Sequence, residues 1–193
     1  MNTVIKGRGA LSRPAGRFDR TVTAAVDDGW RAATVAGDAQ FGTDADALPR
    51  LATTLSPERA KTIITRNASP DIPFDQSINP YRGCEHGCIY CYARPSHAYV
   101  DLSPGLDFET RLFYKADAAK LLRAELAKPS YVCKPIMLGA NTDPYQPVER
   151  EQRVTQQILE VLAEHRHPVA IITKGALLER DLDLFANLAG DRL

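Results

Sequence analysis

Three of the four cysteines lie within eight residues, and this loop constrains the chain more than any other feature. The spacing is Cys84-x3-Cys88-x2-Cys91. A loop this short can bring three thiolates to one point, where they would bind a metal ion or an iron–sulfur cluster. Gly83 and Gly87 allow the backbone to turn where a Cβ atom would clash. A four-iron cluster usually takes four cysteines, so a site with three would leave one iron open to a ligand that is not protein.

A zinc site and a disulfide framework are the alternative uses of these cysteines. A structural zinc site would need a fourth ligand from Cys133, His86, His97 or His165, none of which sits at zinc-knuckle spacing. The N-terminus has no apolar signal-peptide core, and four cysteines in 193 residues are too few for a disulfide scaffold. We therefore expect the thiols to be in a reducing, cytoplasmic compartment.

The cysteine loop, with Tyr90 just before its third cysteine, resembles the signature of the radical S-adenosylmethionine (SAM) superfamily. Residues 77–84 (SINPYRGC) and 141–149 (NTDPYQPVE) resemble the branch of that superfamily related to spore photoproduct lyase. Residues 6–10 (KGRGA) are similar to an uncharacterised bacterial subfamily of this branch. The resemblance covers most of the chain from residue 62 to residue 193.

The resemblance implies the cofactors and the chemistry. Cys84, Cys88 and Cys91 would ligate a 4Fe-4S cluster, and SAM would chelate the open iron. Reductive cleavage of SAM would give a 5′-deoxyadenosyl radical that acts on an unknown substrate, in a lyase-like enzyme. An electron donor such as flavodoxin or ferredoxin would reduce the cluster. The alternatives are a non-catalytic iron–sulfur or zinc module, or an inactive truncated relative of an enzyme.

The resemblance also implies a set of SAM-binding residues, each with a purely structural alternative. Tyr90 would pack beside the adenine, or serve as a core aromatic. Asn141, Thr142 and Asp143 offer short oxygen-bearing side chains suited to the SAM ammonium, but they also suit a plain turn. Lys174 would approach the SAM carboxylate, or be an exposed lysine at a strand end. No catalytic residue is assigned.

One position departs from the lyase branch. Spore photoproduct lyase uses a cysteine beside the SAM site to return a hydrogen atom to its product radical, and Ala140 stands at that position here. Cys133 comes before the predicted strand and should lie at the opposite end of the sheet. This difference argues against thymine-dimer repair by that route, but not against SAM cleavage.

The apolar pattern predicts an α/β fold with parallel βα units, because strand-like and helix-like segments alternate. Loops at the carboxyl ends of such strands carry the functional residues, which is where the cysteine loop, residues 141–143 and Lys174 fall. The predicted strands are 62–65, 78–81, 108–115, 135–139 and 169–173. The predicted helices are 96–100, 117–128, 149–165 and a last one with a stripe of Leu178, Leu182 and Phe185.

The resemblance implies a six-stranded (β/α)6 barrel, of which the chain would hold about the first half. We expect a weakly structured segment over residues 1–60 and a radical SAM domain, incomplete at its C-terminus, over 61–193. The strand at 169–173 is apolar at all but its last position and should be buried on both faces. Such an incomplete barrel would be marginally soluble, or would pair with another polypeptide.

Charge and hydropathy exclude some partners. Lysine plus arginine and aspartate plus glutamate both number 24, so the formal net charge is zero and tight nucleic-acid binding is not expected. No apolar run is long enough to span a membrane. One mild basic cluster, read here as a solvated tail, consists of Lys6, Arg8, Arg13, Arg17 and Arg20.

Overall fold

The computed structural model describes residues 8–9 and 52–190, which form two compact units. The smaller unit comprises Met1–Leu55 and Gly83–Leu112, and the larger comprises Ser56–Arg82 and Phe113–Leu193. Most of the segment expected to be weakly structured lies outside the described residues. No helix in the described part of the chain has the length and apolar character needed to cross a bilayer.

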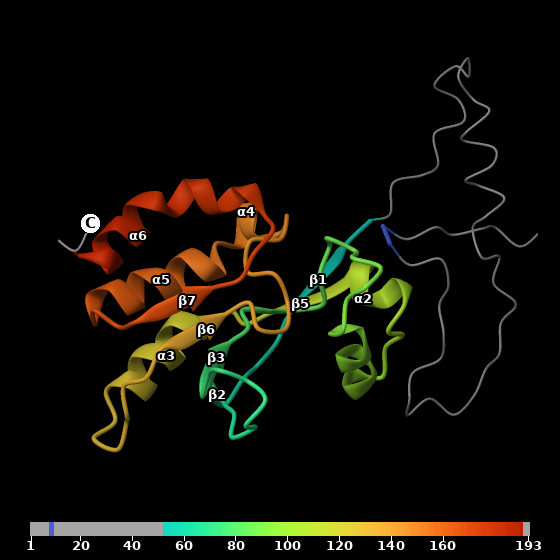
Figure 1. Cartoon of the computed structure of the whole chain (residues 1–193). Coiled ribbons are helices and arrows are strands. Elements are labelled where there is room, and N and C mark those ends of the chain that lie inside the picture. Colours follow the sequence, from blue (N-terminus) through green and yellow to red (C-terminus); the bar gives the residue numbers. More distant parts are fainter. Residues whose placement is uncertain (1–7, 10–51, 191–193) are drawn as a thin grey trace, which may run out of the picture. The chain divides into compact units, whose positions relative to one another are not determined.

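The larger unit is built on a four-stranded sheet with the order β2-β3-β6-β7 (Figure 1). β3, β6 and β7 run parallel, which confirms the predicted parallel βα units, and β2 is antiparallel to β3. Ile78, Leu138 and Ile171 stand side by side across the three parallel strands. The strands are β2 (Thr65–Arg66), β3 (Gln76–Ile78), β6 (Ile136–Leu138) and β7 (Val169–Ile171).

Helices cover this sheet and close its core. α3 (Ala118–Leu126) packs against α5 (Val154–Glu164), and α5 packs against α6 (Leu182–Ala189), which follows the 3-10 helix η3 (Ala176–Asp181). The sequence predicts an apolar face of Val154, Ile158, Val161 and Leu162 for the helix at 149–165, and this face is confirmed because all four residues are buried in α5. Full burial of each such aliphatic side chain contributes about 1.5–3 kcal/mol. The completely buried members of this core include Ile78, Leu122, Ile136, Leu138, Ile158 and Leu162.

Two predictions for the C-terminal part were wrong. Ile172 is 57% exposed, and β7 is only partly buried. β7 is the last strand of its sheet within the described residues, so no neighbour covers its outer edge. Leu182, expected in the buried stripe of the last helix, is 55% exposed, whereas Leu178 and Phe185 do pack against the core.

The single helix predicted over residues 149–165 is interrupted. α4 (Glu149–Gln152) ends at Arg153, which adopts a left-handed conformation with φ of 52°, and α5 starts immediately after it. A non-glycine residue with positive φ ends regular helical geometry. The break lets the carboxylate of Glu149 accept hydrogen bonds from the first-turn amides of α5.

A second sheet has the order β1-β5-β4, with β1 (Thr54–Pro57), β5 (Arg111–Tyr114) and β4 (Tyr81–Arg82). The strand predicted over 108–115 is correct only in its second half, because α2 (Leu106–Thr110) precedes β5. Local side-chain hydrogen bonds accompany this helical turn. The Asp107 carboxylate accepts from Ser103 N at 3.0 Å, and Thr110 Oγ1 donates to the Leu106 carbonyl at 2.8 Å.

In the smaller unit, the predicted short helix is present as the 3-10 helix η2 (Arg94–Val100). His97, on η2, is fully buried, and its Nε2 lies 2.8 Å from the Arg111 carbonyl oxygen. The imidazole meets the Phe108 ring edge-on, with the centroids 5.3 Å apart. These contacts hold η2 against α2 and the start of β5.

Candidate functional site

The three clustered cysteines are free thiols in the smaller unit. Cys84 is 7% exposed and forms a small apolar cluster with Ala93 and Phe108, against which Cys91 also packs. Cys88 is partly exposed. Two of the three thiols therefore share one apolar environment, and the third lies between them in sequence at a more open position.

The glycines of the loop are required by its backbone. Gly83 has φ of 79° and Gly87 has φ of 59°, a conformation that side chains disfavour. A Cβ atom on Gly83 would come within 2.9 Å of both the His97 ring and the Phe108 carbonyl oxygen. Tight turns join successive cysteines, because Gly87 N donates to the Cys84 carbonyl and Cys91 N donates to the Cys88 carbonyl.

The chemistry of this donor set fits an iron–sulfur cluster. Three free thiols occur at short spacing on a glycine-bearing loop, in a partly apolar environment. Among the described residues, no three His, Cys, Asp or Glu side chains are already gathered closely enough to hold a metal ion. Two possible fourth ligands are engaged elsewhere, since His97 contacts the Arg111 carbonyl oxygen and His165 Nδ1 lies 2.9 Å from the Val161 carbonyl oxygen.

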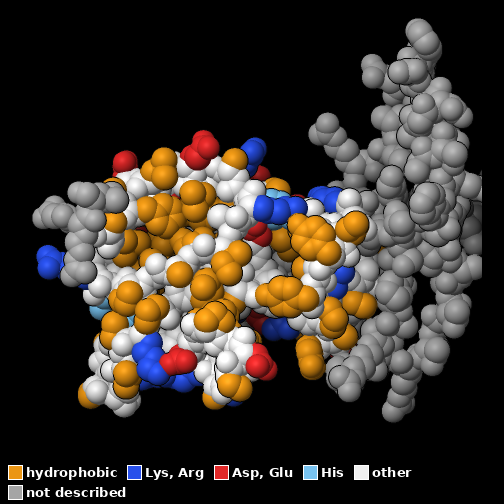
Figure 2. Space-filling model, viewed as in Figure 1, with side chains coloured by type: hydrophobic (Ala, Val, Ile, Leu, Met, Phe, Trp, Pro, Cys, Tyr) orange, Lys and Arg blue, Asp and Glu red, His pale blue; other side chains and the backbone are white. Residues whose placement is uncertain are grey.

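Tyr90 is 80% exposed, which excludes the alternative of a core aromatic. Its neighbours Ile89 and Tyr92 are also exposed, at 80% and 76%. Hydrophobic side chains of other described residues also reach the surface on the face drawn in Figure 2. The loop thus presents large apolar side chains outward while two of its cysteines point into the small core.

Charged residues that the sequence analysis left unassigned hold the cysteine loop. Arg94 donates from Nε and Nη2 to the carbonyl oxygen of Cys88, at 3.2 and 3.0 Å. Glu109, which is completely buried, pairs with Arg94 at 2.6 Å. Arg8, expected in a solvated tail, instead pairs with Glu85 at 3.3 Å, so that expectation was wrong for this residue. The other four residues of the basic cluster lie outside the described part.

The predicted SAM-binding turn lies in the larger unit, after β6. Asn79, just after β3, accepts with Oδ1 from the backbone amides of Asn141 and Thr142 at 2.8 and 3.4 Å. Thr142 Oγ1 donates to the Tyr81 carbonyl oxygen at 2.8 Å. In the sequence, Asn79 stands out only as a member of the motif at residues 77–84. Its position directly after a strand is the signal that could have identified it as a brace of this turn.

Asp143 joins the loops that follow β6 and β7. Its Oδ1 accepts from Tyr145 N at 2.8 Å and Thr173 Oγ1 at 2.6 Å, and its Oδ2 accepts from the backbone amide of Lys174 at 2.9 Å. The structure therefore brings together Asn141, Thr142, Asp143 and Lys174. The three cysteines and Tyr90 belong to the other unit.

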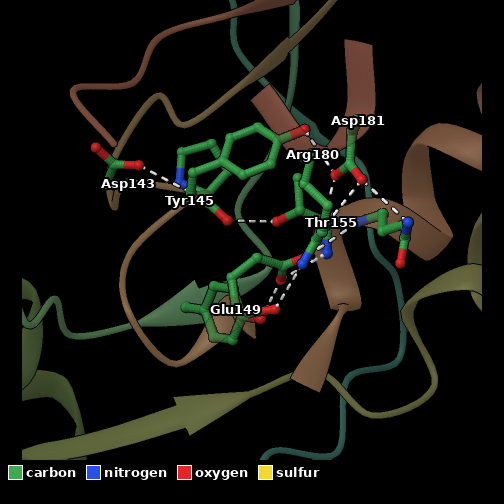
Figure 3. A network of polar contacts seen from close by, with 9 residues as sticks. Asp143, Tyr145, Glu149, Thr155, Arg180 and Asp181 are labelled. Carbon is green, nitrogen blue, oxygen red and sulfur yellow. Dashed lines mark hydrogen bonds and ion pairs between the residues drawn. The ribbon is translucent and has the colours of Figure 1, made fainter. Parts of the chain in front are cut away.

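Behind this turn lies a network of buried polar side chains centred on Glu149 (Figure 3). The Glu149 carboxylate accepts from the amides of Thr155 and Gln156, from the Tyr81 hydroxyl and from Arg180. Burial raises the pKa of Tyr81 well above its usual range, and the Glu149 carboxylate raises it further. The position of this carboxylate at the start of α5 is favourable, because it accepts from the first-turn amides of the helix.

Arg180 extends the network to η3. Its Nη2 contacts both Glu149 Oε1 at 2.9 Å and Asp181 Oδ2 at 2.8 Å. Asp181 also accepts from the Tyr145 hydroxyl at 3.0 Å (Figure 3). Hydrogen bonding to Asp181, followed by that to Glu149, raises the pKa of Arg180. Charges buried this deeply are stable only when paired, so these contacts fix the helices behind the turn.

Comparison of the sequence with known protein families identifies the family of this chain. The sequence pattern of the radical SAM superfamily matches residues 78–193, which include the cysteine loop, the turn at residues 141–143 and Lys174. The chain belongs to the radical SAM superfamily. Superfamily members typically use a 4Fe-4S cluster and SAM, and they are generally enzymes. SAM-dependent radical chemistry with an iron–sulfur cluster is characteristic of that superfamily.

The chain is similar to proteins of mycobacteria and of an archaeon. Uncharacterised proteins of Mycobacterium tuberculosis and Mycobacterium bovis are 47% identical over 118 residues, which cover 61% of this chain and 35% of theirs. An uncharacterised protein of Methanocaldococcus jannaschii is 30% identical over 108 residues, or 56% of this chain and 38% of its own. The chain spans about a third of the length of these relatives. No solved structure matches.

Proposed function

We propose that this chain binds a 4Fe-4S cluster through Cys84, Cys88 and Cys91, with SAM as the ligand of the remaining iron. The observation that carries the proposal is the set of three free thiols at Cys-x3-Cys-x2-Cys spacing, inside the stretch that matches the superfamily. Two of these thiols pack in one apolar cluster, an environment that limits access of water to a bound group.

The residues of the chain have separate roles in this proposal. A cluster and SAM, when bound, would supply the one-electron reductive cleavage of SAM. The exposed ring of Tyr90 is available to pack on the adenine. Asn141 and Thr142 lie on a turn whose backbone is fixed by Asn79 and suit the SAM ammonium. Asp143 holds the backbone of Lys174 in place for an approach to the SAM carboxylate.

The finer family assignment belongs to the same proposal. The motifs at residues 77–84 and 141–149 support a spore photoproduct lyase-like branch, and Ala140 argues against repair by that enzyme's hydrogen-return route. The parallel order β3-β6-β7 is consistent with the first part of a (β/α)6 barrel over residues 61–193. The complete protein would then be a cytoplasmic enzyme reduced by a flavodoxin or ferredoxin, acting on an unassigned substrate.

Anaerobic reconstitution followed by a SAM-cleavage assay tests the proposal. We expect about four irons and four sulfides per chain, and formation of 5′-deoxyadenosine when dithionite and SAM are added. The control is the variant with Cys84, Cys88 and Cys91 all changed to alanine. Stoichiometric zinc without iron uptake would refute the cluster. A cluster without 5′-deoxyadenosine above the control would leave a non-catalytic module or an inactive relative, separated by whether SAM binds.

A further inference from the structure

We propose that Arg94 and Glu109 are positioning residues that hold the cysteine loop in the conformation in which Cys88 ligates the cluster. This inference rests on the proposed function, since it assigns a role to residues that touch the loop rather than the cluster. Both residues lie in the smaller unit, and no motif of the sequence analysis included them.

The Arg94 side chain holds the middle of the cysteine loop by hydrogen bonds to the backbone of the loop. The Arg94 side chain is 14% exposed, and two nitrogens of its guanidinium donate to the one carbonyl oxygen of Cys88. A third nitrogen, Nη1, donates to the carbonyl oxygen of Gly105 at 3.2 Å. A planar guanidinium with fixed donors constrains orientation as well as distance, which a single lysine ammonium does not.

Glu109 fixes the orientation of Arg94. Its side chain is 0% exposed, and both carboxylate oxygens have partners. Oε1 accepts from Arg94 Nη2 at 2.6 Å, and Oε2 accepts from the backbone amide of Gly9 at 3.0 Å. A buried carboxylate without such partners would cost several kcal/mol, so the pair determines where Arg94 can point.

A second set of contacts holds the first turn of the same loop. Arg8 pairs with Glu85, the residue after Cys84, and Thr53 Oγ1 donates to the same Glu85 oxygen at 2.5 Å. Gly9 is so close to Gly87 that an added Cβ atom would come within 1.5 Å of the Gly87 carbonyl oxygen. Glu109 connects the two sets, because it accepts from Gly9 and from Arg94.

The loop has a physical need for this support. Gly83 and Gly87 permit its turns but also increase the backbone entropy that must be lost when the loop is ordered. Holding the Cys88 carbonyl reduces the number of conformations that cluster binding must select. Loss of the Arg94 hydrogen bonds should therefore speed the loss of the cluster and the motion of the loop. These effects should exceed any change in the overall stability of the chain.

The test compares the wild-type chain with the variant Arg94→Lys. The lysine keeps the positive charge beside Glu109 but loses the paired guanidinium donors to the Cys88 carbonyl oxygen. The matched control is the variant Arg123→Lys on the surface of the larger unit. There, Arg123 also donates from two guanidinium nitrogens, Nε and Nη2, to the Glu164 carboxylate at 3.0 and 2.8 Å. Three quantities are measured: the rate of cluster loss to an iron chelator, hydrogen exchange of the amides of residues 84–91 in the cluster-free chain, and the melting midpoint of that chain.

For Arg94→Lys we expect cluster loss and loop exchange each to be about tenfold faster than in the wild type, the effect of losing one charge-assisted hydrogen bond. Arg123→Lys should leave both within about twofold. The proposal is overturned if Arg94→Lys lowers only the melting midpoint while both loop measurements match the control.

A second variant covers the case in which the first does not fold. The double variant Arg94→Gln with Glu109→Gln leaves no unpaired buried charge, and its loop should show the same acceleration. If the wild-type chain takes up no iron, the proposed function fails. The exchange measurement on the cluster-free chain then decides independently whether Arg94 orders the loop.

Discussion

Replacing Glu149 with glutamine should destabilise the larger unit severely, although the change alters one atom. The carboxylate is 0% exposed and receives four donors. A glutamine amide must place its NH2 group where one carboxylate oxygen stood. Arg180 can only donate, so the NH2 group should take the Oε2 position, where the Tyr81 hydroxyl can rotate and accept.

The loss of stability follows from the hydrogen bond and the ion pair that a glutamine at this position cannot keep. The amide of Thr155, which bonds to Oε2 at 3.0 Å, is left facing a donor, which costs about 1–3 kcal/mol. The ion pair with Arg180 also loses its negative partner, although Asp181 still contacts the guanidinium. Breaking a buried pair from one side typically costs about 3–5 kcal/mol, and we take this as the total expected loss because Asp181 retains part of the interaction.

Thermal unfolding followed by circular dichroism measures this loss. For a chain of this length, about 3–5 kcal/mol corresponds to a fall in the melting midpoint of about 6–20 °C. Glu164→Gln is the control, since that carboxylate forms an exposed ion pair with Arg123 and its loss should leave the midpoint unchanged. A Glu149→Gln midpoint within about 2 °C of the wild type would refute the assignment of Glu149 as the centre of the network.

Three further predictions concern other parts of the larger unit. Gly139→Ala should lower stability by about 2 kcal/mol or more, because the position has φ of 82° and a Cβ atom would come 2.4 Å from the Ile172 carbonyl oxygen. Gly190→Ala, at φ of 62° with open space around it, should cost less in the same denaturant titration. Burial lowers the pKa of His167, so the unfolded chain binds a proton at this histidine more readily than the folded chain does. The free energy of unfolding should therefore fall by up to about 1.4 kcal/mol per pH unit as the pH drops below about 6.5. The variant His167→Gln should flatten this dependence of stability on pH. Sedimentation of the chain should show self-association through the open edge of β7, and a clean monomer would contradict that expectation.

Periodicity was sufficient to predict only part of the larger unit, where apolar side chains repeat at helical or strand spacing. The faces of α3 and α5 and the strand at Ile136–Leu138 follow directly from that pattern. Periodicity could not show that Arg153 would break a helix, since residues 149–153 are all polar and carry no apolar pattern that could show an interruption. Nor could it show that β7 would be an exposed edge, because exposure depends on neighbours that lie far away in sequence.

The candidate site likewise contains residues that the sequence could identify and residues that it could not. The cysteines and the turn at Asn141 stand out because their residue types and spacing are local. Arg94, Glu109 and Arg8 do not, because each acts through a partner distant in sequence, and isolated charges usually lie on a solvated surface. Only the fold shows that Glu109 is completely buried, and burial is what makes its partners necessary.

The pairing of β4 with β5 has a consequence for how this protein could be rebuilt. Arg82 and Phe113 are opposite one another in that antiparallel pair, and the intervening residues 83–112 carry all three clustered cysteines. In topological terms this segment is the loop of one β-hairpin, with its two ends at neighbouring positions. It is therefore a natural cassette: a two-residue turn such as Asn-Gly could replace it and leave the surrounding strands in register, and a cysteine segment from a relative could be transplanted between the same two positions.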